Sequence, residues 1–212
     1  RLYCGDFCFG SPHRNHFQPL LFTFIRAIKM FVAQDLRKKS IAEYLLYMWQ
    51  IEDIIRAYGC SLTRIKNEYI SRFDFTEEQK EEELDWFGDL VRMMNQEGCR
   101  EKGHLQINKI LLQDLSELNA RLLASTKFPF YSTEYYKVLP FIVELRQKGQ
   151  KEENEIATCF NALYGVMMLR LQKKTISPET SHAIKEITTF IGMLSDYYIK
   201  ERDEGLDFEE DN

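Results

Sequence analysis

The sequence predicts an all-α protein, an antiparallel bundle of five to seven helices without a β-sheet. Apolar residues recur at intervals of three and four along most of the chain, which is the period of a helix. No stretch shows the alternation of apolar and polar residues that is typical of a strand. The 212 residues include only 10 glycines and 5 prolines, too few for the many tight turns of an all-β fold. This length suits a single domain.

The helix predicted at residues 41–58 has the widest apolar face. Its main stripe is formed by Ile41, Tyr44, Met48, Ile51, Ile55 and Tyr58. Leu45 and Trp49 widen this stripe, so we expect the helix to be central and to contact several others. Gly59 is suited to end it, because glycine adopts the left-handed conformation that follows many helices.

Two helices are predicted in the middle of the chain, after a short one over residues 61–70. Thr76 and Gln79 have the spacing of a capping box, in which each side chain binds the other residue's backbone N–H at a helix start. Gly98 and Gly103 bracket the end of that helix. The next helix has one apolar face, formed by Ile107, Leu111, Leu115, Leu118 and Leu122.

Three further helices are predicted around residues 135–145, 156–171 and 178–198. We expect a loop over residues 127–130 before the first of them, and a kink at Pro140 within it. The last helix has a strong start signal, because Ser177 is a good N-cap and Pro178 suits the first helical position.

Composition divides the chain into three parts: residues 1–29, a single helical domain at 30–202, and an acidic tail at 203–212 that we expect to fray. The first part has four basic residues against one acid, and no methionine precedes Met30. We interpret it as a non-native or disordered extension from a misassigned start codon. Its apolar run at residues 20–25 is too short for a secretory signal.

A zinc site is an alternative interpretation of the first part. Two thiolates and two imidazoles suit tetrahedral zinc, and the sequence supplies Cys4, Cys8, His13 and His16. Only four residues separate the cysteine pair from the histidine pair, whereas a two-Cys, two-His finger has about 12. We therefore favour an extension without metal.

Charge and cysteine usage exclude several functional classes. The net charge of −5 disfavours nucleic-acid binding, which needs a basic face. No apolar run approaches the roughly 20 residues of a membrane span. The five cysteines are odd in number and mostly far apart, as in a protein with reduced thiols. We expect a cytoplasmic protein that binds no nucleic acid, membrane or cofactor.

The stretch MFVAQDLRKKSIAEYLLYMWQIEDIIRAYG, residues 30–59, resembles the start of a bacterial family catalogued only as domain of unknown function 4924. The segment EYYKVLPFIVELRQK, residues 134–148, fits the same family. The resemblance covers Met30 to about Arg202, so residues 1–29 lie outside it. It implies a compact helical cytoplasmic protein, and it implies no activity and no functional residues.

A metal site is one candidate for chemistry. Di-metal helical bundles combine Glu-x-x-His from two helices with glutamates from two others. This chain has the spacing twice, and the candidate ligands are Glu101, His104, Glu179 and His182. Gly103 is expected to end a helix beside His104, and Glu179 lies in a first turn, where acids are favoured anyway. We therefore predict no metal.

Weak candidates for catalysis are Glu52 and Asp53, together with His104 and His182. Both acids lie among apolar residues, and a buried carboxylate can mark a catalytic acid because burial is costly unless the group is paired. The simpler interpretation is that Asp53 faces solvent while Glu52 pairs with an arginine or tyrosine of a neighbouring helix.

Aromatic residues suggest a protein interface, because tyrosine and tryptophan bury much area with few rotatable bonds. The candidates are Tyr47, Trp49, Phe128, Phe130, Tyr131 and Tyr136. Ordinary core packing is the alternative for each of them.

No complete catalytic motif is present. We expect a non-enzymatic interaction protein that self-associates into a homo-oligomer. The alternative is a small-molecule or metal-binding bundle, or an enzyme, with a carboxylate and histidine pocket.

Overall fold

The computed structural model describes residues 29–148 and 154–208. Within these residues the chain forms helices and no strand, which confirms the all-α prediction. The long helices are α2 (Lys29–Lys39), α3 (Ile41–Ala57), α5 (Glu77–Gln96), α6 (Gln106–Ala124), α7 (Pro129–Lys148), α8 (Glu155–Leu171) and α9 (Pro178–Asp203). Between α3 and α5 lie α4 (Leu62–Arg64), a π-helical turn (Ile65–Tyr69) and a 3₁₀ turn (Ile70–Arg72).

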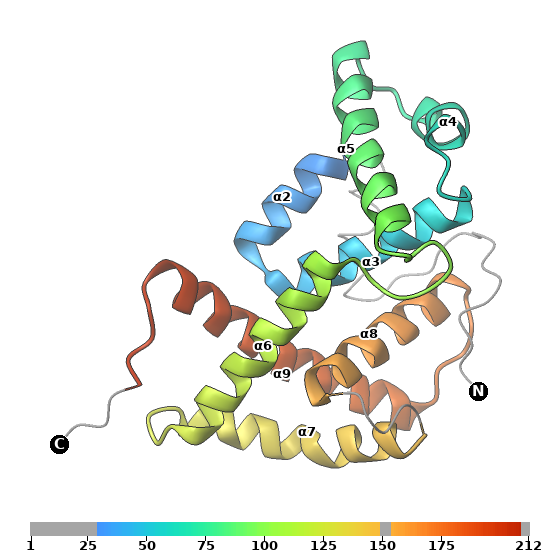
Figure 1. The fold of residues 1–212 in the computed structure, drawn as a ribbon. Helices are drawn as coiled ribbons and strands as arrows, with labels where there is room; N and C mark the ends of the chain where they lie inside the picture. The colour runs from blue at the N-terminus through green and yellow to red at the C-terminus, as the bar shows by residue number, and fades with distance from the viewer. Residues whose placement is uncertain (1–28, 149–153, 209–212) are drawn as a thin grey trace.

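Two helices hold the bundle together. Helix α3 contacts α2, α5, α6 and α9, and helix α9 contacts α3, α6, α7 and α8. Helices α7, α8 and α9 form the lower half of the molecule in Figure 1, while α2, α4 and α5 extend from the upper side of α3. The prediction that residues 41–58 form the central helix, in contact with several others, is therefore confirmed.

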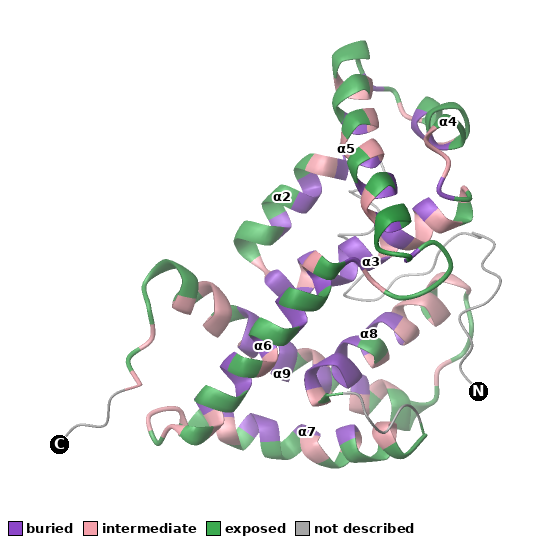
Figure 2. Cartoon of the chain, viewed as in Figure 1, coloured by how far each residue is buried: buried purple, intermediate pink, exposed green. Residues whose placement is uncertain are grey.

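The core follows from the apolar faces of these helices (Figure 2). On α3, Leu45 and Ile55 are completely buried, and the charged Glu52 is buried with them. Ser40 separates α2 from α3, because its extended backbone and its side chain, which accepts from Glu43 N–H, make it the N-cap of α3. We predicted the central helix from residue 41 onward but did not predict α2. The Ser40 hydroxyl also lies 3.3 Å from that of Ser195 on α9.

The two helix starts that were predicted from N-cap side chains are confirmed. Both hydrogen bonds of the Thr76–Gln79 capping box are present, and Ser177 accepts from Thr180 N–H ahead of Pro178. Gly59 follows α3 with a φ of +68°, which an L side chain rarely adopts.

The predicted loop at residues 127–130 is wrong in its second half. Helix α7 begins at Pro129, which suits the start of a helix because its missing N–H would have no partner there. The helix also continues through Pro140.

The structure describes only part of the chain on either side of the bundle. Residues 1–28, with the candidate zinc ligands, lie outside the described residues. Of the tail that we expected to fray, Leu206 and Phe208 pack against the core, and Lys127 pairs with Asp207 at 2.6 Å. Among the described residues, no helix is long and apolar enough to cross a membrane.

Replacement of Thr76 tests whether the N-cap of α5 stabilises the protein. Thr76→Ala removes the acceptor for Gln79 N–H and should lower the free energy of unfolding by about 1 kcal/mol. Urea denaturation measures the change. The control Thr175→Ala alters an exposed loop threonine and should stay within about 0.5 kcal/mol of wild type. Equal effects of the two variants would show that the cap adds nothing.

Candidate functional site

Helix α3 places a polar cluster against the loop that joins α5 to α6. We call this set the Glu52 cluster, and it consists of Trp49, Glu52, Asp53, Arg56, His104, Asn108 and Tyr164. Its members come from α3, the α5–α6 loop, the first turn of α6, and α8. Three of the four candidate catalytic residues, Glu52, Asp53 and His104, therefore belong to one cluster, although His104 is far from the other two in the sequence.

The carboxylate of Glu52 is completely buried and saturated with donors. One oxygen accepts from Leu105 N–H at 2.9 Å and from the Asn108 amide at 2.7 Å. The other lies 2.6 Å from His104 Nδ1 and 3.8 Å from the Arg56 guanidinium. The buried charge of Glu52 is tolerated because each of these neighbouring groups either donates a hydrogen bond to the carboxylate or carries a positive charge.

The position of Glu52 also completes the start of α6. Leu105 is the N-cap of that helix and has no side chain that can cap it. The carboxylate takes that role from another helix, and the positive end of the α6 dipole favours an anion there. We expected Glu52 to pair with an arginine or tyrosine of a neighbouring helix. Its close partners are instead His104 and Asn108, while Arg56 lies on the same helix.

Asp53 and Arg56 form hydrogen bonds that connect α3 to α8 and to the α5–α6 loop. Asp53 accepts from Arg56 at 2.7 Å and from the Tyr164 hydroxyl of α8 at 2.6 Å, and its side chain is 38% exposed. The guanidinium of Arg56 also donates to the carbonyl oxygens of Cys99 and Gly103 in the α5–α6 loop. Arg56 therefore links α3 to the α5–α6 loop.

The ring of His104 is partly accessible to solvent. Its ring stacks on Trp49 with centroids 4.0 Å apart, and its side chain is 28% exposed. An ionised carboxylate only accepts hydrogen bonds, so Nδ1 donates to Glu52. In the neutral imidazole this leaves the lone pair on Nε2, the nitrogen that a ligand or proton would use.

The predicted metal ligands do not assemble. Glu101 is exposed in the loop, and Glu179 is exposed in the first turn of α9, where hydrogen bonds from its own backbone N–H and from Ser177 lower its pKa. His182 is exposed and makes a ring contact with Phe141. Among the described residues, no three His, Cys, Asp or Glu side chains form a group that could hold a metal ion.

The candidate interface residues differ in how far they are buried. Tyr47, Trp49 and Tyr131 are buried inside the chain, so a partner protein does not reach them, and they belong to the core. Phe128 is half-buried between Tyr197 and Phe208. Phe130 and Tyr136 are each 65% exposed.

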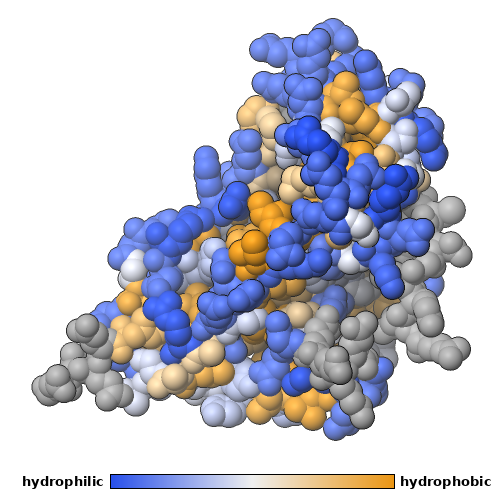
Figure 3. Space-filling model, viewed as in Figure 1, coloured by the Kyte–Doolittle hydropathy of each residue, from blue (hydrophilic) through white to orange (hydrophobic). Residues whose placement is uncertain are grey.

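The two exposed aromatics belong to a larger apolar surface on α7. We call it the α7 outer face, formed by Phe130, Tyr136, Pro140 and Val143, with Lys137 and Glu144 along one edge. Figure 2 shows α7 at the lower margin of the molecule with buried and exposed positions in alternation, and Figure 3 shows apolar atoms along the same margin. Our sequence reasoning missed Pro140 and Val143, although their helical spacing from Tyr136 was a usable signal.

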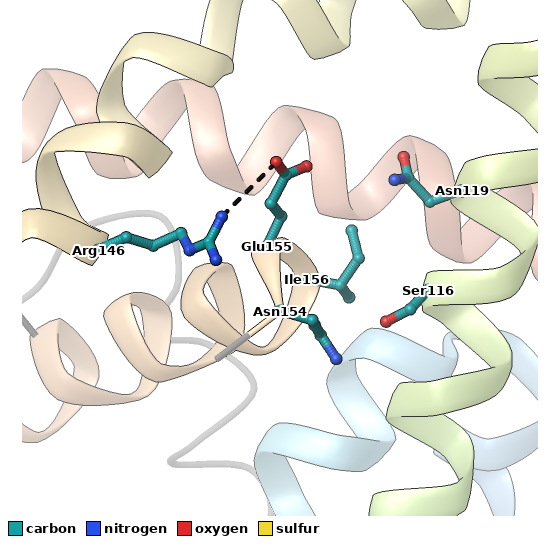
Figure 4. Close-up of a pocket in the computed structure, with 6 residues that line it drawn as sticks. All are labelled: Ser116, Asn119, Arg146, Asn154, Glu155 and Ile156. Atoms are coloured by element: carbon teal, nitrogen blue, oxygen red, sulfur yellow. Dashed lines mark ion pairs between the residues drawn. The ribbon is translucent and has the colours of Figure 1, made fainter. Parts of the chain in front are cut away.

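A hollow of about 240 Å³ lies between α6, α7 and the start of α8 (Figure 4). Ser116 and Asn119 face Asn154 and Glu155 across it, and Arg146 points toward Glu155 at 3.9 Å. It is shallow and lies apart from the Glu52 cluster, since the two share no residue.

Removing the Glu52 carboxylate should destabilise the protein strongly. Glu52→Ala leaves Leu105 N–H and the Asn108 amide without their acceptor in a buried place, which should cost about 3 kcal/mol or more. Urea denaturation measures this, and hydrogen exchange at Leu105 should speed up. The control Glu81→Ala changes an exposed acid of α5 and should have little effect. A Glu52→Ala protein as stable as that control would contradict the role given to Glu52.

Comparison with known proteins gives one match. No curated protein and no solved structure matches the chain. The sequence of residues 30–205 matches the family described as Domain of unknown function (DUF4924), nearly the range expected from the resemblance. The chain therefore belongs to the DUF4924 family.

Proposed function

We propose that this protein is a cytoplasmic helical interaction protein that self-associates through the α7 outer face. The supporting observation is that α7 has apolar side chains on two opposite sides. Its inner side buries Tyr131, Val138 and Ile142 in the core. On its outer side, Tyr136 is 65% exposed and Val143 46% exposed. The buried free thiols of Cys60, Cys99 and Cys159 suit a reducing compartment.

The occupant that fits this face is a second copy of the same face. Tyr136 and Val143 are seven residues apart, so they lie on one edge of the helix two turns apart. Lys137 and Glu144 have the same spacing on the other edge. When two copies pair antiparallel about a two-fold axis at Pro140, each tyrosine meets the partner's valine and each lysine meets the partner's glutamate. The face is thus complementary to itself, as a two-fold interface requires.

The charged edge already carries ion pairs within α7. Lys137 now pairs with Glu134, and Glu144 with Lys148, all within α7. The lysine and glutamate side chains of the edge are 52% and 60% exposed. The exposed Glu144–Lys148 pair contributes only about 0.3–0.5 kcal/mol, so Glu144 can pair across the interface without overcoming a strong competitor. Glu134 is buried, so Lys137 meets the partner's glutamate while it keeps its contact with Glu134.

The size of the face sets the expected affinity. A contact made mainly by one helix from each copy is smaller than the standard interface of about 1,600 Å². We therefore expect a dimer with a dissociation constant in the micromolar range. Affinity reflects only the interaction free energy that exceeds the entropic cost of association, and a small contact leaves little excess.

An acidic residue on the apolar edge of the face should prevent self-association. Val143→Glu should shift the dimer to monomer, because it places a charged side chain against the partner's tyrosine at position 136. Sedimentation velocity over a concentration series measures this. The matched control is Ile110→Glu, which changes a side chain that is 48% exposed on α6. A wild-type chain that stays monomeric at every concentration would refute the proposal.

Exchange of the edge charges tests the antiparallel register. Lys137→Glu and Glu144→Lys should each weaken the dimer several-fold, because each places like charges opposite one another. The double variant should recover affinity, since the opposite charges meet again in swapped positions. Loss of affinity that is simply additive in the double variant would exclude this register.

A second candidate function is the binding of a small polar molecule at His104. The observation in its favour is that Glu52 fixes the histidine with Nε2 free to accept a proton or hydrogen bond. Beside it, Trp49 Nε1 and Asn108 Oδ1 are buried and make no hydrogen bond within the described residues. A donor and an acceptor of this kind suit a bound polar group.

Native mass spectrometry of the protein, purified without chelator, tests this candidate. It predicts a stoichiometric small-molecule or metal adduct that His104→Gln abolishes. His182→Gln is the matched control, because His182 is exposed and lies outside the cluster. A bare mass in wild type would count against binding at His104.

A further inference from the structure

A second buried carboxylate lies at the start of α2, outside the Glu52 cluster. Glu83 of α5 is 1% exposed, and its Oε1 accepts from the backbone nitrogen of Met30 at 3.0 Å. Burial raises the pKa of Glu83 to about 7, although the Met30 N–H and the charge of Lys29 act in the opposite direction. A buried anion of this kind is costly unless a cation stands close by.

Three further groups face this carboxylate. Lys29 is the nearby cation; its ammonium lies 5.3 Å from the centroid of the Phe73 ring, and burial lowers its pKa to about 8. Tyr47 on α3 and Tyr69 on the π-helical turn are neutral, and the proximity of Glu83 adds to the burial that raises their pKa values. In the present chain, the balancing charge therefore comes from a lysine side chain.

Residue 30 is also where the family match begins. All helices from α3 onward, and every residue of the described apolar core, follow Met30 in the sequence. A chain whose first residue is Met30 lacks Lys29, and its backbone nitrogen becomes an α-ammonium group in the same place.

We propose that Glu83 is a receptor for a free α-amino group on Met30. The ammonium replaces Lys29 as the counter-charge and turns the 3.0 Å hydrogen bond into an ion pair. An α-amino group has a pKa of about 7.7–8.0, so it is charged at neutral pH. At the start of a helix the macrodipole disfavours such a cation, and the buried carboxylate offsets this effect.

The test compares chains that begin at Met30 with a free or an acetylated amino group, each with Glu83 or Glu83→Gln. Acetylation keeps the N–H donor but removes the charge, and the acetyl group takes the place of the Lys29 carbonyl. With the free amine, Glu83→Gln should lower Tm by ~5 °C or more. With the acetylated amine, Glu83→Gln should leave Tm unchanged or raise it, because the carboxylate is then a buried charge without a cation.

The control is Glu82→Gln, which changes the exposed neighbouring acid and should not depend on acetylation. The full chain is measured in parallel, and there Glu83→Gln should lower Tm because Lys29 supplies the charge. The same Glu83→Gln effect with free and acetylated amines would overturn the proposal. A chain from Met30 that does not fold would also overturn it.

A second measurement uses the protein made from its own gene in its own cells. Mass spectrometry of its N-terminal peptide should find Met30 first, with an unmodified amino group. A first residue upstream of Met30, or a blocked Met30, would show that the receptor is not used in this way.

Discussion

The buried carboxylate of Glu52 is the interaction on which the centre of this fold depends. It lies on the helix that contacts α2, α5, α6 and α9, and it accepts from the last residues of the α5–α6 loop and from the first turn of α6. Because a buried anion needs all its donors in place, α6 and the loop before it are held in one position relative to α3. Arg56 adds to this constraint by binding loop carbonyl groups from the same helix. Removal of the Glu52 side chain would expose polar groups that the core cannot satisfy.

Glu83 shows the same principle at the edge of the bundle, where the start of α2 meets α5. In both places a carboxylate of one helix receives the N–H group at the start of another, which joins helices that are distant in sequence. These contacts define the interior, whereas the α7 outer face contributes nothing to it. An apolar surface without a role in the fold is a reasonable place for a partner to bind, and the repeat of seven residues along both its edges points to a second copy.

Most of the helices could be predicted from the sequence, whereas the side-chain contacts between helices could not. Periodicity and caps predict α3, α5 and α9 because these signals are local, as with Thr76 and Ser177. Helix α2 was not predicted, because Val32, Ala33 and Leu36 are its only buried apolar residues and give no clear period. Glu52 and His104 were each candidates, yet nothing in the spacing of residues 52 and 104 brings them together. Burial of Trp49 and Tyr131 depends on which helices cover them, so a single helix pattern does not separate core aromatics such as these from the exposed Tyr136.

The central functional claim is that two α7 helices pair antiparallel about Pro140. Oxidative cross-linking tests it most directly, in full chains whose Cys4 and Cys8 are replaced by serine. Pro140→Cys places the new thiol at the two-fold axis, and Thr133→Cys places it on the same face near the helix end. In the antiparallel pair the two copies of residue 133 are about 14 residues apart along the axis, roughly 21 Å. We predict a disulfide-linked dimer for Pro140→Cys and none for Thr133→Cys. Equal cross-linking of both variants, or none of either, would contradict the account.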